Sequence, residues 1–215
     1  MIDPIPVDLI IKGILDAPSE SRAVEFKPSI PWNDINHQQQ LQEIVKSILG
    51  MSNIKDGGKI ILGVKQNPDK TFEATGVRRE HLETYDQEKI YQDVRNFGEP
   101  APRLEIKSMK YSGKFFIVFL VQEFLYSPII CCRNGRNLGS EPLVRGALYI
   151  RTHAPGTKRV DNETEMREII NLAIDKELDL SSEKMQRLVK TLSHTKAPEG
   201  ETDTKKFINE VSDIL

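Results

Sequence analysis

The feature that most constrains the fold is a short apolar run, KIILGV at residues 59–64, which follows directly after two glycines. A short apolar run bounded by turn residues is typical of a strand that is buried on both faces. We therefore expect residues 59–64 to form a central strand of a sheet. Gly57 and Gly58 provide either the backbone geometry of a tight turn or a close approach of the main chain to a ligand.

The same kinds of pattern predict the other elements of the chain. Alternating or apolar segments predict strands at residues 23–27, 71–77, 129–132 and 147–151, and a hairpin over 104–109 and 114–121. The strand over 147–151 is expected to be the last of the chain. Helical spacing of apolar residues predicts helices at residues 6–17, 37–50, 86–97, 163–176 and 181–193. Asn36 and Asn162 are the expected N-caps of two of these helices. The predicted class is α+β, with a mixed or antiparallel sheet flanked by helices.

The composition changes after residue 178. We expect one domain over residues 1–178 and a helical appendage over 179–215, in which 195–206 is a polar linker and 207–215 a short amphipathic helix. The appendage would pack on the domain or on a second subunit, and a homodimer is therefore expected.

Positive charge is concentrated in the middle of the chain, although the net charge of the whole chain is only -2. Residues 101–160 carry ten Lys and Arg against three Asp and Glu. Such a block is either an ordinary solvated face or a surface that binds a polyanion. The candidate phosphate-contacting residues are Lys65, Arg103, Lys107, Arg133, Arg136, Arg145, Arg151, Lys158 and Arg159. We expect the fold to gather them on one concave wall.

A second group of charged side chains lies near the N-terminus. On a strand over residues 23–27, Glu25 and Lys27 share one face and Phe26 points to the core. Glu20 can approach Glu25 only if the chain turns near Ser21. These charges either form an ion pair on an exposed strand edge or belong to a functional site.

Cys131 and Cys132 are adjacent and provide no disulfide framework. We interpret them as small strand residues. The chain has no recognisable signal peptide and no apolar run of membrane-spanning length. A cytoplasmic protein without membrane contact is therefore expected.

Several of these segments together resemble a known family. ESRAVEFK at 20–27, the glycine turn before 59–64, and GALYIRTHAPGTKRV at 146–160 are similar to the Schlafen-type AlbA-like domain, over about residues 15–176. The resemblance implies an α+β fold and, for many prokaryotic members, binding of nucleic acid in regulation or defence.

The same resemblance implies a second possible role. Animal Schlafens include metal-dependent endoribonucleases with three carboxylates, of which two match Glu20 and Glu25, whereas Lys65 stands at the third position. In that case Glu20 and Glu25 would hold Mg²⁺ or Mn²⁺. A second route to the same chemistry is a Glu-X-Lys arrangement, with Asp16 or Glu20 before Glu25 and Lys27, in which the carboxylates hold the metal and Lys27 positions the attacking water. Lys65 would instead contact a phosphate.

Three functions therefore remain open. The expected function is binding of DNA or RNA through the phosphate backbone and its shape. The alternatives are a divalent-metal-dependent endoribonuclease and a module that binds an acidic protein partner. The sequence does not distinguish DNA from RNA.

Overall fold

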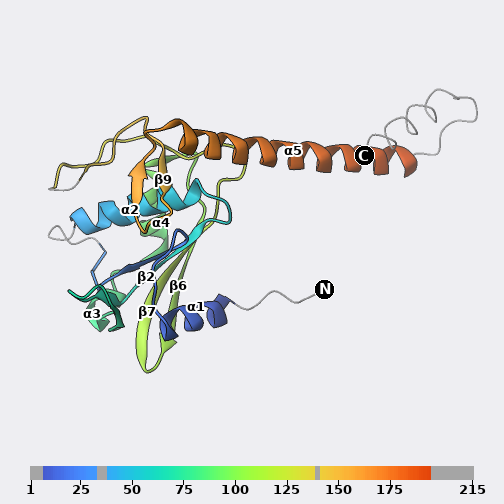
Figure 1. Ribbon diagram of the computed structural model, residues 1–215. Helices are drawn as coiled ribbons and strands as arrows, with labels where there is room; N and C mark the ends of the chain where they lie inside the picture. Colours follow the sequence, from blue (N-terminus) through green and yellow to red (C-terminus); the bar gives the residue numbers. More distant parts are fainter. Residues whose placement is uncertain (1–6, 33–37, 139–140, 195–215) are drawn as a thin grey trace, which may run out of the picture. The chain divides into compact units, whose positions relative to one another are not determined.

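The computed structural model describes residues 7–32, 38–138 and 141–194 (Figure 1). The chain divides into two compact units, residues 1–170 and residues 171–215, and the fold below is that of the first. The expected division between residues 178 and 179 stays a prediction. The predicted N-cap Asn36, linker 195–206 and helix 207–215 lie outside the described residues.

The centre of the fold is a mixed four-stranded sheet in the order β1-β2-β7-β6. Its strands are β1 (Val24–Lys27), β2 (Gly58–Leu62), β7 (Lys114–Val121) and β6 (Leu104–Tyr111). β1 is parallel to β2, and the β2–β7 and β6–β7 pairs are antiparallel. The α+β class, the interior position of residues 59–62 and the hairpin are therefore confirmed. The strand predicted over 59–64 ends earlier than expected, because the chain leaves it at Gly63 (φ 99°) and Val64 pairs with Ala74 in a separate sheet.

The two faces of the sheet are covered by different helices, α1 (Val7–Asp16) and α2 (Gln38–Ser52) (Figure 1). Ile11 and Leu15 of α1 pack with Phe26 and Ile61 on one face. α2 contacts the other face of β2 and β7 and buries Ile48 among other apolar side chains. Because side chains alternate along a strand, β1 sends Phe26 toward α1 and its neighbours Glu25 and Lys27 toward α2.

The remaining elements surround this sheet. They are β3 (Val64–Gln66), β4 (Phe72–Ala74), α3 (Arg79–Leu82), α4 (Gln87–Arg95), β5 (Gly98–Glu99), β8 (Ile130–Cys131), β9 (Tyr149–Arg151), β10 (Thr157–Arg159) and α5 (Glu163–His194). β3–β4, β5–β8 and β9–β10 form three two-stranded sheets. Among the described residues no helix is both long enough and apolar enough to cross a bilayer.

Two predictions about the C-terminal part were wrong. The strand over 147–151 is not the last, because the chain turns back through a hydrogen bond from Thr152 N to Gly156 O (3.0 Å) and β10 pairs with β9. The helices predicted at 163–176 and 181–193 are one helix, α5, because the serines between them are only moderately poor helix formers. Asn162 caps it as expected, with its Oδ1 accepting from Glu165 N at 3.0 Å.

A buried asparagine holds the segments that carry the site. The side chain of Asn53, just after α2, donates to the carbonyls of Ile129 (2.9 Å) and Tyr149 (3.0 Å) and accepts from Ile129 N (2.8 Å). The residue is fully buried, and each of these bonds replaces one that water would otherwise make. It thereby fastens the end of α2 to the segments of β8 and β9.

Candidate functional site

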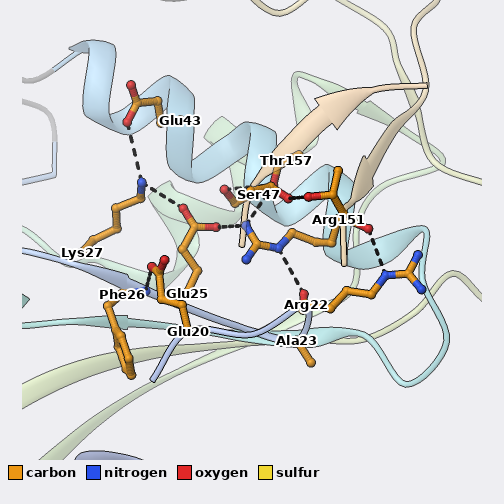
Figure 2. A network of polar contacts seen from close by, with 12 residues as sticks. Glu20, Arg22, Ala23, Glu25, Phe26, Lys27, Glu43, Ser47, Arg151 and Thr157 are labelled. Carbon is orange, nitrogen blue, oxygen red and sulfur yellow. Dashed lines mark hydrogen bonds and ion pairs between the residues drawn. The ribbon is translucent and has the colours of Figure 1, made fainter. Parts of the chain in front are cut away.

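Glu25 and Arg151 form a buried ion pair between β1 and β9. Arg151 Nη1 lies 2.6 Å from Glu25 Oε2, and the two residues are 1% and 6% exposed (Figure 2). Lys27 Nζ lies 2.8 Å from the other carboxylate oxygen of Glu25 and 3.6 Å from Glu43 on α2. The interpretation of Glu25 as part of an exposed strand edge was therefore wrong, because α2 and β9 lie over this face.

The guanidinium of Arg151 has further partners in the β1 segment. It donates to the carbonyls of Arg22 (3.1 Å) and Ser21 (3.0 Å) and to the Thr157 hydroxyl (3.2 Å). Arg22 in turn donates through Nε to the carbonyl of Arg151 at 2.9 Å. Arg151 therefore holds the entry to β1 and cannot belong to a solvent-facing phosphate surface, as the sequence had suggested.

The charges in this network stabilise one another. Burial alone would lower the pKa of Lys27, but Glu25 beside it, with Glu43 and Glu20, outweighs this effect and raises that pKa above its usual 10.5. Burial lowers the pKa of Arg151, which Glu25 and Glu20 partly offset. An arginine stays protonated under such a shift, so Glu25 faces two cations at neutral pH.

Glu20 is held by the main chain. The chain turns at Ser21, as expected, through a hydrogen bond from Ser21 N to Val24 O (3.0 Å). Glu20 Oε1 then accepts from Phe26 N at 2.9 Å, whereas the Glu25 carboxylate lies between Lys27 and Arg151 (Figure 2).

These residues do not fit the Mg²⁺ or Mn²⁺ that the resemblance implies. A hard divalent cation needs several free oxygen ligands, but both oxygens of Glu25 contact cationic nitrogens, and one oxygen of Glu20 is taken by the backbone. Lys65, at the position of the third ligand, lies on β3 opposite Glu73 in the strand register. Among the described residues no group of three or more His, Cys, Asp or Glu side chains is placed to hold a metal.

The predicted phosphate-contacting residues are not on one wall. Arg151 is buried, and Lys158 pairs with Asp161 (2.9 Å) and Glu165 (3.0 Å). Lys107 pairs with Glu105 and lines a separate pocket at α1 and β6. Arg103, Arg145 and Arg159 are exposed on different segments. Of these candidates, Arg133 and Arg136 line one pocket together.

Arg133 and Arg136 line a pocket of about 630 Å³, which we call the amide pocket. It lies between α2, α4 and the loop 133–136. Its lining residues are Trp32, Gln38, Leu41, Gln42, Val45, Lys89, Asp93, Asn96, Phe97, Arg133, Asn134, Gly135 and Arg136. Trp32 is buried at the base of this pocket, with its Nε1 donating to Asp93 Oδ2 at 2.9 Å.

Side-chain amides of α2 hold the loop in place. Gln42 Oε1 accepts from the backbone N–H of Arg136 at 2.7 Å, and Gln38 Oε1 accepts from Arg136 Nη1 at 2.7 Å. A Cβ at Gly135 would lie 2.2 Å from Gln42 Oε1, so the absence of a side chain there allows this contact. At the start of the loop, Cys132 N donates to Phe97 O at 2.9 Å.

The amide pocket carries an excess of positive charge. Lys89, Arg133 and Arg136 are exposed, and the lining contains one acid, Asp93. Neither Lys89 nor Arg133 forms an ion pair with any other described residue. Sequence reasoning found the two arginines but missed Lys89 and the amides, because their approach depends on how α2 and α4 pack.

Comparisons with known proteins identify one matching family and two similar solved structures. The family model described as Schlafen, AlbA_2 matches residues 20–160. The DIP2311 protein from Corynebacterium diphtheriae is 15% identical with a TM-score of 0.47, over 75% of this chain and 28% of that one.

The N-terminal domain of an ATP-dependent DNA helicase RecG-related protein from Nitrosomonas europaea is 19% identical to this chain, with a TM-score of 0.42. That match covers 74% of this chain and 96% of that one. The chain thus spans well under two thirds of the first of these structures and nearly all of the second. No curated protein matches the chain.

Proposed function

Because the chain belongs to the Schlafen AlbA_2 family, we propose that it binds nucleic acid through the amide pocket and its cationic rim. The observation that carries the proposal is the set of three exposed cations, Lys89, Arg133 and Arg136, around one hollow surface. With Asp93 as the single acid of the lining, the pocket has a net positive charge and attracts a polyanion.

Contacts of this kind act mainly on phosphate groups. Each Lys or Arg that neutralises a phosphate releases bound counterions, so affinity falls steeply as salt is raised. Backbone phosphates are common to DNA and RNA, and the rim cations themselves do not distinguish the two. The surface supports both polymers as ligands, and both belong in the test.

The endoribonuclease alternative is not proposed. Its metal would have to displace Lys27 and Arg151 from Glu25, which would leave Arg151 buried without its partner. The protein-interaction alternative remains as an outcome of the experiment, because an acidic protein would be attracted by the same cations.

The test measures fluorescence anisotropy of labelled duplex DNA and of RNA over a range of salt concentrations. Arg133→Ala and Lys89→Ala should each weaken binding severalfold and reduce the slope of log K against log salt by about one. Arg79→Ala is the matched control, because it removes an equal charge from an exposed site on α3, outside the amide pocket. Equal effects of Arg79→Ala and Arg133→Ala would reject this interface, and no salt-sensitive binding of either polymer would favour an acidic protein partner.

We also propose that the protein is a homodimer that pairs through α5. Ile174, Leu178, Met185 and Leu188 are exposed apolar side chains, and with Ser181 their spacing alternates between four and three residues. This is the heptad spacing with which a helix pairs with another helix. Light scattering should give the mass of two chains for the protein and of one chain for Leu178→Glu; a monomeric wild-type protein would contradict the proposal.

A further inference from the structure

We infer that the amide pocket accepts one unpaired nucleotide of a single strand, with the base inside and its phosphate at the cationic rim. This inference rests on the proposed function and names the form of nucleic acid that the same site takes. Three features of the pocket carry it: an apolar floor, a wall of hydrogen-bond donors, and a position between two helices.

The floor of the amide pocket offers an apolar surface for the face of a base. Phe97 is half-buried and lines the pocket together with Leu41 and Val45, while the ring of Trp32 lies beneath. Unpaired bases in protein complexes stack on side chains of this kind. The volume of about 630 Å³ lies within the range of small-ligand pockets and accommodates a base with its sugar.

The wall of the pocket is rich in donors because its amide oxygens are already used. The side-chain oxygens of Gln38 and Gln42 accept from Arg136, and Asn134 Oδ1 accepts from Arg145 N at 2.8 Å. Each of these bonds has an N–H donor on the other side, which fixes the orientation of the amide.

The NH2 groups of Gln38, Gln42 and Asn134 can therefore donate hydrogen bonds to a ligand. The Asn96 side chain, which forms no hydrogen bond with another described residue, adds a fourth amide. Such a wall matches the carbonyl oxygens of uracil or guanine better than the exocyclic amine of adenine, which would meet N–H groups.

The position of the pocket selects unpaired nucleotides. Its walls are α2, α4 and the loop 133–136, so a base that contacts the floor has to lie between these protein segments. Bases in a duplex stay stacked and paired, and a protein reaches their faces only after they leave the stack. A duplex can touch the rim cations with its phosphates, but it leaves the floor and the donor wall unused.

Trp32 provides a direct readout, because it is the only tryptophan of the chain and it lines the pocket. We would titrate the full chain with oligo(U) and oligo(A) of about twelve nucleotides, with blunt duplex RNA of equal phosphate number, and with free UMP. Tryptophan emission reports entry into the pocket, and anisotropy of labelled oligonucleotides reports binding anywhere.

We expect oligo(U) to bind about tenfold more tightly than duplex RNA and severalfold more tightly than oligo(A), and to change Trp32 emission where duplex does not. Phe97→Leu and Asn96→Ala should each weaken oligo(U) binding about fivefold or more and leave duplex binding unchanged. Gln66→Ala on β3, which removes an exposed amide outside the pocket, is the control and should affect neither.

Three results would overturn the inference. The inference would be rejected if duplex RNA bound as tightly as oligo(U) and neither Phe97→Leu nor Asn96→Ala changed the affinity for oligo(U). The proposed function would remain intact in that case. Oligo(A) binding equal to that of oligo(U) would reject the role of the donor wall, and UMP binding tighter than oligo(U) would assign the pocket to a free nucleotide. Absence of salt-sensitive binding by every polymer would instead reject the proposed function itself.

Discussion

Arg151, the last residue of β9, places its guanidinium 2.6 Å from the carboxylate of Glu25 on β1, across 126 positions of sequence. The pair joins the edge of the main sheet to the β9–β10 ribbon in a region that is almost closed to water. Removing one member leaves the other charged and buried, which costs more than the pair itself contributes.

Glu25→Ala should therefore destabilise the protein strongly. We expect a loss of about 3–5 kcal/mol in the free energy of unfolding, because Arg151 would keep its charge without a partner. Urea denaturation measures the loss, with Glu83→Ala, an exposed glutamate after α3, as control. The double variant Glu25→Leu with Arg151→Met should recover much of the stability. A loss below about 1 kcal/mol in Glu25→Ala would mean that water reaches Arg151.

Lys27 should make the stability depend on alkaline pH. Burial opposes its charge, but Glu25, Glu43 and Glu20 outweigh that effect, so its pKa in the folded protein lies above the usual 10.5. The charged form then stabilises the fold fully below pH 10.5, and this contribution is lost as the pH rises through the higher folded-state pKa.

The matching measurement compares urea unfolding of the wild type and Lys27→Met from neutral pH to about pH 11. At neutral pH the variant should be less stable by about 1–2 kcal/mol, and the difference should shrink above pH 10.5. Other titrating groups are common to both proteins and cancel in the difference. If the difference in free energy of unfolding between the two proteins stayed constant over this pH range, Lys27 would act through packing alone.

Local patterns predicted the sheet, because burial follows directly from them. Residues 59–62 and the strand KFFIVFLV lie inside the sheet, where such apolar runs are expected. The alternation in β1 correctly separated Phe26 from Glu25 and Lys27. It could not show that α2 and β9 cover the charged face, since that depends on segments far along the chain.

The candidate site was only partly predictable for the same reason. The excess of cations in residues 101–160 pointed to Arg133 and Arg136, but the same count included Arg151, which the fold buries beside Glu25. Lys89 and Asn96 belong to an ordinary amphipathic helix and its end, and nothing in their sequence distinguishes them from other surface residues. They become part of a pocket only because α4 packs beside α2.

Gly57 is the glycine whose replacement the structure opposes most clearly. The sequence left open a tight turn or an approach to a ligand, and the structure shows a turn with φ of 65° packed against the chain's own backbone. A Cβ on Gly57 would lie 2.1 Å from the carbonyl oxygen of Val121, at the end of β7.

Gly57→Ala should thus cost about 3 kcal/mol or more, by adding a backbone clash to the strain of positive φ. Gly113→Ala is the matched control, because Gly113 also has positive φ, 77°, but its Cβ would meet no atom within 4 Å. Gly113→Ala should lower the free energy of unfolding by only about 1–2 kcal/mol, because it adds the strain of positive φ without a clash. Equal losses in urea denaturation would show that β7 yields to the added methyl group.

The adjacent cysteines should differ sharply in reactivity, although the sequence treats them alike. Cys131 is buried on β8, and burial, with a smaller contribution from Cys132, raises the pKa of its thiol against the opposing effect of the Arg133 backbone. Cys132 is exposed where the chain enters the loop 133–136. Because the thiolate is the reactive form, a disulfide reagent at mildly alkaline pH should modify Cys132 at least about tenfold faster than Cys131.

The number of fast-reacting thiols checks this prediction. Native protein should show one fast thiol per chain and denatured protein two, and Cys132→Ser should remove the fast phase of the native protein. Two fast thiols in the native protein would mean that β8 opens readily, and with it the anchoring of the loop that carries Arg133 and Arg136.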